Sequence, residues 1–269
     1  MRQTLRLYFR LVGVQIRSQL QYPASFLFDL VANFATLIIY FLSLALIFDR
    51  FKNIGGWTLG EVAFLWGLVE ISFGFMDMIF SGFDPDTFSQ LVRLGQFDQL
   101  LLRPIGITLQ VLGCKFILRR WGRILQGCMV FGVSLSMLSV HWTPAKLLYL
   151  PLVIASMILF FGAMYITGAT LTFWTVQPIE AVNIFTYGGT EMIAYPMHIY
   201  ADWMRRFFTF VIPAIFMNYY PALYLLDKPD PFGMPAFVRF LAPLAGMAML
   251  AAALLFWQYG LRHYESTGS

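Results

Sequence analysis

Long apolar blocks recur along almost the whole chain, and this repetition limits the possible folds more than any other feature. About six blocks lie at 26–48, 59–83, 121–140, 147–176, 205–226 and 238–260. A helix needs about 20 apolar residues to cross the roughly 30 Å hydrocarbon core of a bilayer. With 59% hydrophobic and 12% charged residues, the 269-residue chain is too apolar for a soluble domain. We therefore predict one all-α polytopic membrane domain, residues 1–269, with about six transmembrane helices.

The distribution of lysine and arginine predicts the orientation, because both collect in cytoplasmic loops. With an even number of spans and both termini in the cytoplasm, most basic residues fall inside. Those predicted to be cytoplasmic are Arg2, Arg6, Arg10, Arg17, Arg93, Arg103, Lys115, Arg119, Arg120, Arg123, Arg205, Arg206 and Arg262, and those predicted to be outside are Arg50, Lys52, Lys146, Lys228 and Arg239. The net charge of +4 is explained by this topology, so it needs no nucleic-acid partner.

The fifth block, 205–226, is the weakest of the six. Pro178, Gly188, Gly189 and Pro196 interrupt the stretch before it, and this stretch could be re-entrant or lie at the surface. Pro213 and Pro221 predict that the fifth helix itself is bent.

Residues 2–20 are predicted to form an interfacial amphipathic helix. At 100° per residue its apolar side chains share one face and its arginines share another, a pattern typical of helices that lie in the plane of the membrane surface. The apolar face holds Leu5, Tyr8, Phe9, Val12 and Ile16. Such a helix either anchors the chain or also connects it to a cytosolic partner.

The predicted cytoplasmic loop 84–104 contains a short amphipathic helix. Asp84 or Asp86 can cap its N-terminus, and Pro104 ends the segment that follows. Its apolar face consists of Phe88, Leu91 and Val92. Either lipid or a protein groove could cover this face.

Polar side chains form one stripe on each of the first two predicted helices. The first stripe holds Asp29, Asn33, Thr36, Tyr40 and Ser43, and the second holds Trp66, Glu70, Phe73, Gly74, Asp77 and Ser81. Ionisable side chains at the centre of a membrane helix cost about 2.5–3.5 kcal/mol each and usually face a cavity or a partner. The stripes either bond neighbouring helices or line a translocation path. In the second case we expect Glu70 and Asp77 to favour a cationic or amphipathic substrate, and Phe216 and Tyr220 of the fifth block to join the path.

A run of residues in the 84–104 loop resembles a family signature. Gly95-x-Phe97-Asp98-x-x-Leu101-x-Arg103-Pro104 is similar to the Gly-x-Leu-Asp-x-x-Leu-x-Arg-Pro signature of type-two ATP-binding-cassette exporter permeases, in the group of daunorubicin-resistance-like permeases. Phe97 stands where leucine is usual. Shorter similarities follow in order along nearly the whole chain, among them Gly56-Trp57-Thr58-Leu59, Phe173-Trp174, Tyr195-Pro196 and Tyr220-Pro221.

The resemblance implies a permease subunit that forms half of the translocation path of an exporter in the inner membrane of a prokaryote. It implies a second permease subunit, the same or similar, and two copies of a cytosolic ATPase that bind ATP and Mg²⁺. Residues 84–95 would form a coupling helix in a groove of that ATPase. The coupling residues it implies are Asp86, Phe88, Leu91, Val92, Gly95, Asp98 and Arg103.

The chain itself is predicted to bind no cofactor. A P-loop needs a Gly-Lys pair, and the four lysines follow Phe51, Cys114, Ala145 and Asp227. No zinc-binding spacing and no nucleophile motif is present, so a lipid-modifying membrane enzyme is unsupported. A proton-coupled secondary transporter that uses Glu70 and Asp77 stays open as the alternative.

Overall fold

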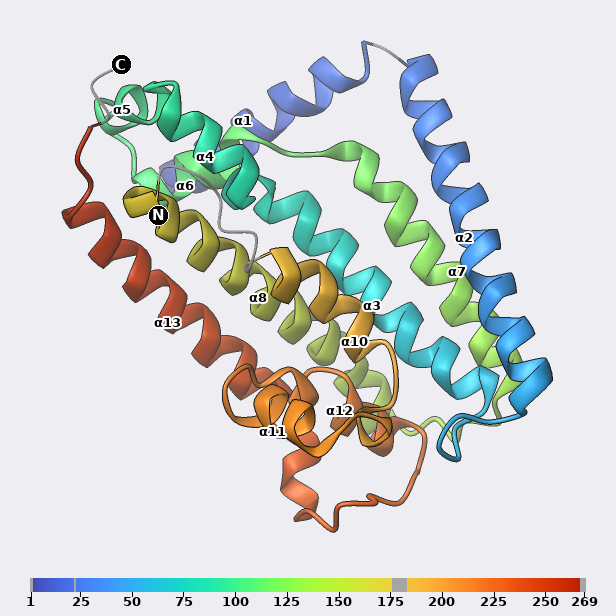
Figure 1. Ribbon diagram of the computed structural model, residues 1–269. Helices are drawn as coiled ribbons and strands as arrows, with labels where there is room; N and C mark the ends of the chain where they lie inside the picture. Colours follow the sequence, from blue (N-terminus) through green and yellow to red (C-terminus); the bar gives the residue numbers. More distant parts are fainter. Residues whose placement is uncertain (1, 22, 176–182, 267–269) are drawn as a thin grey trace.

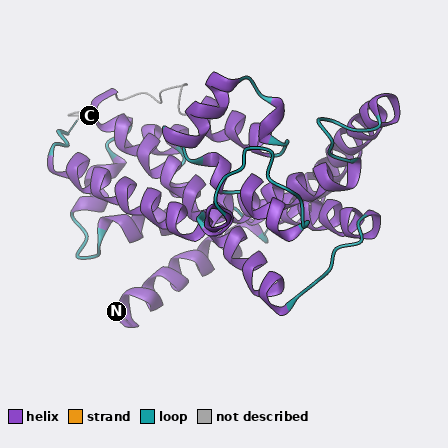
Figure 2. Cartoon of the chain, turned by 90° about the horizontal axis from the view of Figure 1, so that it is seen from below, coloured by secondary structure: helices purple, strands orange, loops and turns teal. Residues whose placement is uncertain are grey.

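The computed structural model describes residues 2–21, 23–175 and 183–266, and across these ranges it is all-α, as the sequence predicts. Helices joined by loops and short turns run through the whole molecule (Figure 2). They are α1 (Arg2–Gln19), α2 (Pro23–Phe51), α3 (Leu59–Phe80), α4 (Pro85–Arg93), α5 (Gln96–Leu101), α6 (Ile107–Cys114), α7 (Trp121–Met137), α8 (Pro144–Thr175), α10 (Gly189–Ile193), α11 (Asp202–Phe210), α12 (Tyr219–Leu225) and α13 (Ala242–Arg262).

Five of these helices coincide in position with predicted apolar blocks. Within the described ranges, three are long and apolar enough to cross a membrane: the α3–α4 unit, α8 and α13. A fourth is added if the bent pair α11 and α12 forms one span. This count leaves out α2, whose side chains are described only in part, and α7, which has 17 residues. The chain is thus a membrane protein with several candidate spans, and the number six stays a prediction.

The block 205–226 is not one continuous helix, and it bends as its prolines predict; whether it crosses the membrane stays a prediction. Asp202–Phe210 and Ala214–Leu225 meet at an angle of 80°. Pro213 stands at the break, where a proline cannot donate the backbone hydrogen bond that would continue a helix.

The bent pair also lies at an unexpected end of the molecule. The guanidinium of Arg205 is 4.5 Å from the ring centroid of Phe232, and Nε2 of His198 is 2.7 Å from the carbonyl oxygen of Gly55. Phe232 and Gly55 belong to loops that were predicted to be outside. Arg205 therefore lies at the same end of the molecule as these loops, and the prediction that they lie on opposite sides of the membrane is not met. Which of the two ends is cytoplasmic stays a prediction.

The central helix is α3, and its packing against α7 sets the position of the polar side chains between them. Most of α3 is buried among its neighbours. The two helices approach closely because glycines stand at the contact: a Cβ atom added to Gly127 would lie 2.7 Å from the backbone nitrogen of Ile71 and 2.9 Å from Cβ of Glu70. The N-terminal half of α7 is thereby held against the middle of α3.

One end of the molecule gathers α1, α4, α5 and α6, together with the C-terminal end of α13 (Figure 1). Gln15 of α1 donates a hydrogen bond of 2.9 Å to the carbonyl oxygen of Cys114 at the end of α6. The side-chain oxygen of Gln19 accepts one of 2.8 Å from the backbone of Leu118. The predicted N-terminal helix is therefore packed on the 84–120 region of its own chain.

Candidate functional site

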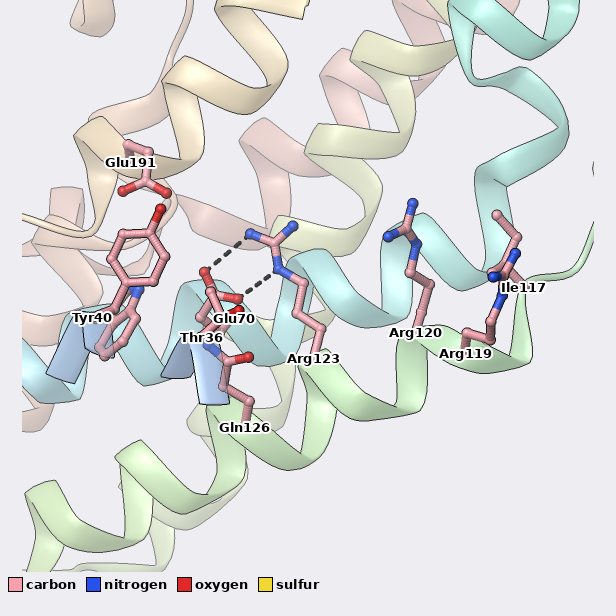
Figure 3. A pocket seen from close by; sticks show the side chains of 10 residues that line it. Thr36, Tyr40, Glu70, Ile117, Arg119, Arg120, Arg123, Gln126 and Glu191 are labelled. Carbon is pink, nitrogen blue, oxygen red and sulfur yellow. Dashed lines mark hydrogen bonds and ion pairs between the residues drawn. The ribbon is translucent and has the colours of Figure 1, made fainter. Parts of the chain in front are cut away.

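A polar cavity of about 450 Å³ opens between α2, α3, α10 and the start of α7. It is the site at which the predicted polar stripes meet. Thr36 and Tyr40 of the first stripe and Trp66 and Glu70 of the second line it. The other lining residues are Ile117, Arg119, Arg120, Arg123, Gln126 and Glu191, and Figure 3 shows their side chains around the cavity.

Glu70 does not face the cavity as a lone acid, because Arg123 of α7 pairs with it. Nε of Arg123 lies 2.6 Å from Oε2 of Glu70 and the guanidinium NH2 lies 3.0 Å from Oε1, so two parallel hydrogen bonds join the side chains. The side chain of Glu70 is 7% exposed and that of Arg123 is 22% exposed. The guanidinium carbon of Arg123 also lies 4.2 Å from the ring centroid of Phe73, a cation–π contact that helps to hold the guanidinium in place.

Asp77, seven residues or about two turns closer to the C-terminal end of α3, forms an ion pair with a second arginine, but the two facing atoms are not aligned for a hydrogen bond. Nε of Arg120 lies 2.7 Å from Oδ2 of Asp77, and the carboxylate side chain is only 3% exposed. Both acids of the stripe are thus matched by arginines of the same neighbouring segment. Because both carboxylates are paired with arginines, neither is a free negative charge in the cavity; the expected preference for a cationic or amphipathic substrate stays a prediction.

Sequence reasoning missed the arginine partners because the positive-inside rule had already assigned them to a loop. A signal was present: Arg120 and Arg123 are three residues apart and therefore share one face of a helix, as do Glu70 and Asp77, which are seven residues apart. Two antiparallel helices with such faces can form two ion pairs.

Of the remaining predicted path residues, those whose side chains are described do not line the cavity. Phe73 is fully buried beneath Arg123 and packs edge-on against the rings of Phe161 and Tyr165. Phe216 and Tyr220 stack on each other at 5.6 Å in the bent pair near α12. The side chains of Asp29 and Asn33 lie outside the described residues.

The apolar face of the 84–104 segment is turned into the chain itself. Phe88 is 0% exposed and Val92 is 1% exposed. The ring of Phe88 lies 5.4 Å from Phe97, 5.5 Å from Phe173 and 5.4 Å from Trp257, centroid to centroid. The expectation that Phe88 and Val92 form an anchor for a partner groove is wrong, because α8 and α13 already cover this face.

A different set of side chains on this segment is exposed. Asp86 and Arg103 face outward, Gly95 and Leu91 are half-buried, and apolar Leu94 and Leu102 are 62% and 86% exposed. Gly95 has φ of +66°, a left-handed conformation that ends α4 and turns the chain into α5.

Asp98 of the signature joins the segment to the C-terminal end of the chain. Its carboxylate accepts hydrogen bonds of 3.0 Å from the hydroxyl of Tyr264 and 2.7 Å from that of Ser266. Burial, and next the hydrogen bond to Asp98, raise the pKa of Tyr264 to about 12, so the phenol keeps the proton that it donates. The aspartate of the signature therefore links α5 to the residues after α13 through two hydrogen bonds.

Comparison with protein families now adds to the geometry. The family model described as "ABC-2 family transporter protein" matches residues 15–268, which is nearly the whole chain. The chain belongs to the ABC-2 family of transporter proteins. Searches of curated proteins and of solved structures found no match.

Membrane components of ABC-2 transporters are typically non-catalytic and act with separate ATPase subunits. The described part of this ABC-2 protein holds no group of three or more His, Cys, Asp or Glu side chains that could bind a metal ion. The cavity between α2, α3, α7 and α10 is the candidate transport site, and the α4–α5 segment is the candidate contact for the ATPase.

Proposed function

We propose that the chain is the membrane-spanning subunit of an ATP-driven exporter of the daunorubicin-resistance-like group. It pairs with a second permease subunit, the same or similar, and with two copies of a cytosolic ATPase. The family match over residues 15–268 carries the proposal, and the signature Gly95 to Pro104 supports the narrower group. The finer claims of direction and stoichiometry rest on that resemblance.

We propose six crossings, with both termini in the cytoplasm of a prokaryotic cell. In this topology α2, α3, α7, α8 and α13 make five of them. The fifth in chain order is made by residues that include Ile184–Gly188, a π-helical turn, and α10. The bent pair α11 and α12 is then a re-entrant element on the outer side. The close contact of Arg205 with Phe232 supports this reading, since both would lie outside.

We propose further that the ATPase binds the exposed side of the α4–α5 segment rather than its buried face. Leu94 and Leu102 are large apolar side chains at 62% and 86% exposure, beside the exposed charges of Asp86 and Arg103. Apolar anchors with a charged rim are typical of protein interfaces. This contact would let ATP-driven closure of the ATPases push on α4 and, through it, on α3.

The experiment that tests this contact compares recovery of the ATPase with tagged permease variants. Leu94→Ala combined with Leu102→Ala should lower recovery about 30-fold, because the loss of interface anchors costs about 2 kcal/mol or more. Thermal stability should stay near wild type, since both side chains are exposed. Phe237→Ala is the matched control, because Phe237 is 63% exposed and lies in the turn Ala236–Phe240 before the start of α13, whereas α4 packs near the other end of that helix. Recovery equal to that of the control would place the ATPase contact elsewhere.

The proton-coupled alternative has less support. The family match points to ATP as the energy source. Glu70 and Asp77, the acids that would carry protons, are each engaged by an arginine.

A further inference from the structure

Helix α1 lies across one end of the molecule, and its sides meet different surroundings. Figure 1 shows it at the end that holds α4, α5 and α6, from which α2, α3, α8 and α13 run to the opposite end. One side of α1 packs on its own chain. Val12 on this side is 8% exposed, and Gln15 and Gln19 form hydrogen bonds with the backbone of residues 114–118. The other sides of the helix are exposed.

A row of apolar side chains lies next to the packed side. Phe9 is 67% exposed, Leu20 directly after the helix is 52% exposed, and Ile16 between them is half-buried. At about 100° per residue the directions of these three side chains fall within about 40° of one another. An exposed apolar row at the end of a membrane protein needs a cover, and the cover is either lipid or a protein partner.

Two exposed arginines form a second row, about 90° around the helix from the apolar one. Arg10 and Arg17 are seven residues apart, so they share a face and lie about 10 Å apart along the axis. Nε of Arg17 donates a hydrogen bond of 3.2 Å to the carbonyl oxygen of Gly13, which uses one of its five N–H donors. Residues 2–19 include no aspartate or glutamate, so every formal side-chain charge of α1 is positive.

This order of surfaces fits a helix that lies on an anionic membrane. The apolar row can enter the acyl region while arginines at its edge extend their apolar stems and reach phosphate groups. Ser18, about 180° around from Phe9, is exposed on the side that would face water. The chain continues from α1 into α2, which exposes Leu27 and Phe28 at 58% and 77%. Because α2 crosses the bilayer in the proposed topology, the end of α1 lies at the membrane boundary.

We propose that α1 is a binding surface for anionic phospholipids, with Phe9, Ile16 and Leu20 in the acyl region and Arg10 and Arg17 at phosphate groups. Two arginines about 10 Å apart contact two neighbouring lipids, one headgroup each. The attraction of one arginine to an anionic membrane surface corresponds to about a fivefold gain in binding. The inference goes beyond the proposed function, since it concerns neither the cavity nor the ATPase.

The test places a fluorophore on the apolar row of the full-length permease. Phe9→Cys is labelled with bimane in a chain that carries Cys114→Ser and Cys128→Ser, and the protein is reconstituted into vesicles of equal phosphatidylglycerol and phosphatidylcholine with the same acyl chains. Bromine on the acyl chains of one lipid or the other quenches a fluorophore that this lipid touches. We expect quenching to show about fivefold enrichment of phosphatidylglycerol around position 9. Equal quenching by the two brominated lipids would overturn the proposal.

Variants of the arginine row identify the source of the enrichment. Arg10→Gln combined with Arg17→Gln should remove it, and Arg10→Lys combined with Arg17→Lys should keep most of it, because the positive charges remain. Arg50→Gln combined with Arg206→Gln is the matched control, since it removes two exposed arginines that lie outside α1. Enrichment that survives the loss of both α1 arginines, or that falls equally in the control, would contradict the proposal.

A label on the opposite side of α1 distinguishes lipid from water and from protein. Iodide in the aqueous phase should quench bimane on Ser18→Cys and leave bimane on Phe9→Cys nearly unquenched. Strong iodide quenching at position 9 would show that the apolar row faces water. Protection from iodide without quenching by either brominated lipid would show a protein cover. Either result overturns the proposal, and because the vesicles hold no ATPase, both are independent of the proposed function.

Discussion

Phe88→Ala is expected to destabilise the permease itself, by about 3–5 kcal/mol, the usual cost of removing a buried aromatic ring. Phe88 is 0% exposed, and its ring packs against Phe83, Phe97, Phe173 and Trp257. Phe83 and Phe97 are close to Phe88 in the sequence, whereas Phe173 comes from α8 and Trp257 from α13. Their shared packing joins the α4–α5 segment to α8 and α13, so the cavity left by alanine would loosen this whole end of the molecule.

The measurement is the temperature at which the purified variant loses its monodisperse peak in detergent, followed by size-exclusion chromatography. The midpoint for Phe88→Ala should fall by several degrees, and ATPase recovery should fall only with it. Leu94→Ala is the control on the same segment, because Leu94 is 62% exposed. If the Phe88→Ala variant kept normal thermal stability but lost the ATPase, Phe88 would be a contact for the ATPase, and this prediction would be wrong.

Glu70→Gln is expected to lower the stability of the folded permease by about 3–5 kcal/mol, because it removes the carboxylate that pairs with the mostly buried charge of Arg123. Arg123 is 22% exposed on its side chain and its two hydrogen bonds to Glu70 are 2.6 and 3.0 Å. Loss of transport by this variant would therefore reflect loss of structure before it reflects loss of a substrate contact.

A double-mutant cycle isolates the ion pair from other effects. The thermal midpoint should fall with Glu70→Gln and with Arg123→Gln. The fall in the double variant should be smaller than the sum of the two single falls. Additive losses would mean that the two side chains act independently. Glu61→Gln tests a second ion pair in the same helix, because Lys228 lies 2.7 Å from Glu61 at the opposite end of α3.

The sequence predicted the long helices well because their apolar content has one explanation in a chain of this composition. It could not predict how the 205–226 block bends, since Pro213 and Pro221 indicate a break without giving its angle. Thr36, Tyr40, Trp66 and Glu70 were correctly placed on helix faces by their spacing, and the structure brings these four residues to one cavity. Their charge environment depended on Arg123, which the positive-inside rule had assigned to the cytoplasmic side and not to a partner.

The coupling segment shows a second limit of sequence reasoning. Amphipathic spacing identified the apolar face of Phe88 and Val92, but it cannot say what covers such a face. Lipid, a partner protein and the chain itself all satisfy the same pattern. Here the cover is Phe173 and Trp257, which follow Phe88 by 85 and 169 positions in the sequence. Contacts over such distances leave no local signal.

The most direct test of the account is purification of the tagged chain from its native membrane in mild detergent, followed by mass spectrometry of the proteins that remain bound. The account predicts a P-loop ATPase in stoichiometric amount, and ATP hydrolysis by the complex but not by the chain alone. Transport by the purified chain alone in vesicles, driven by a proton gradient and independent of ATP, would contradict it.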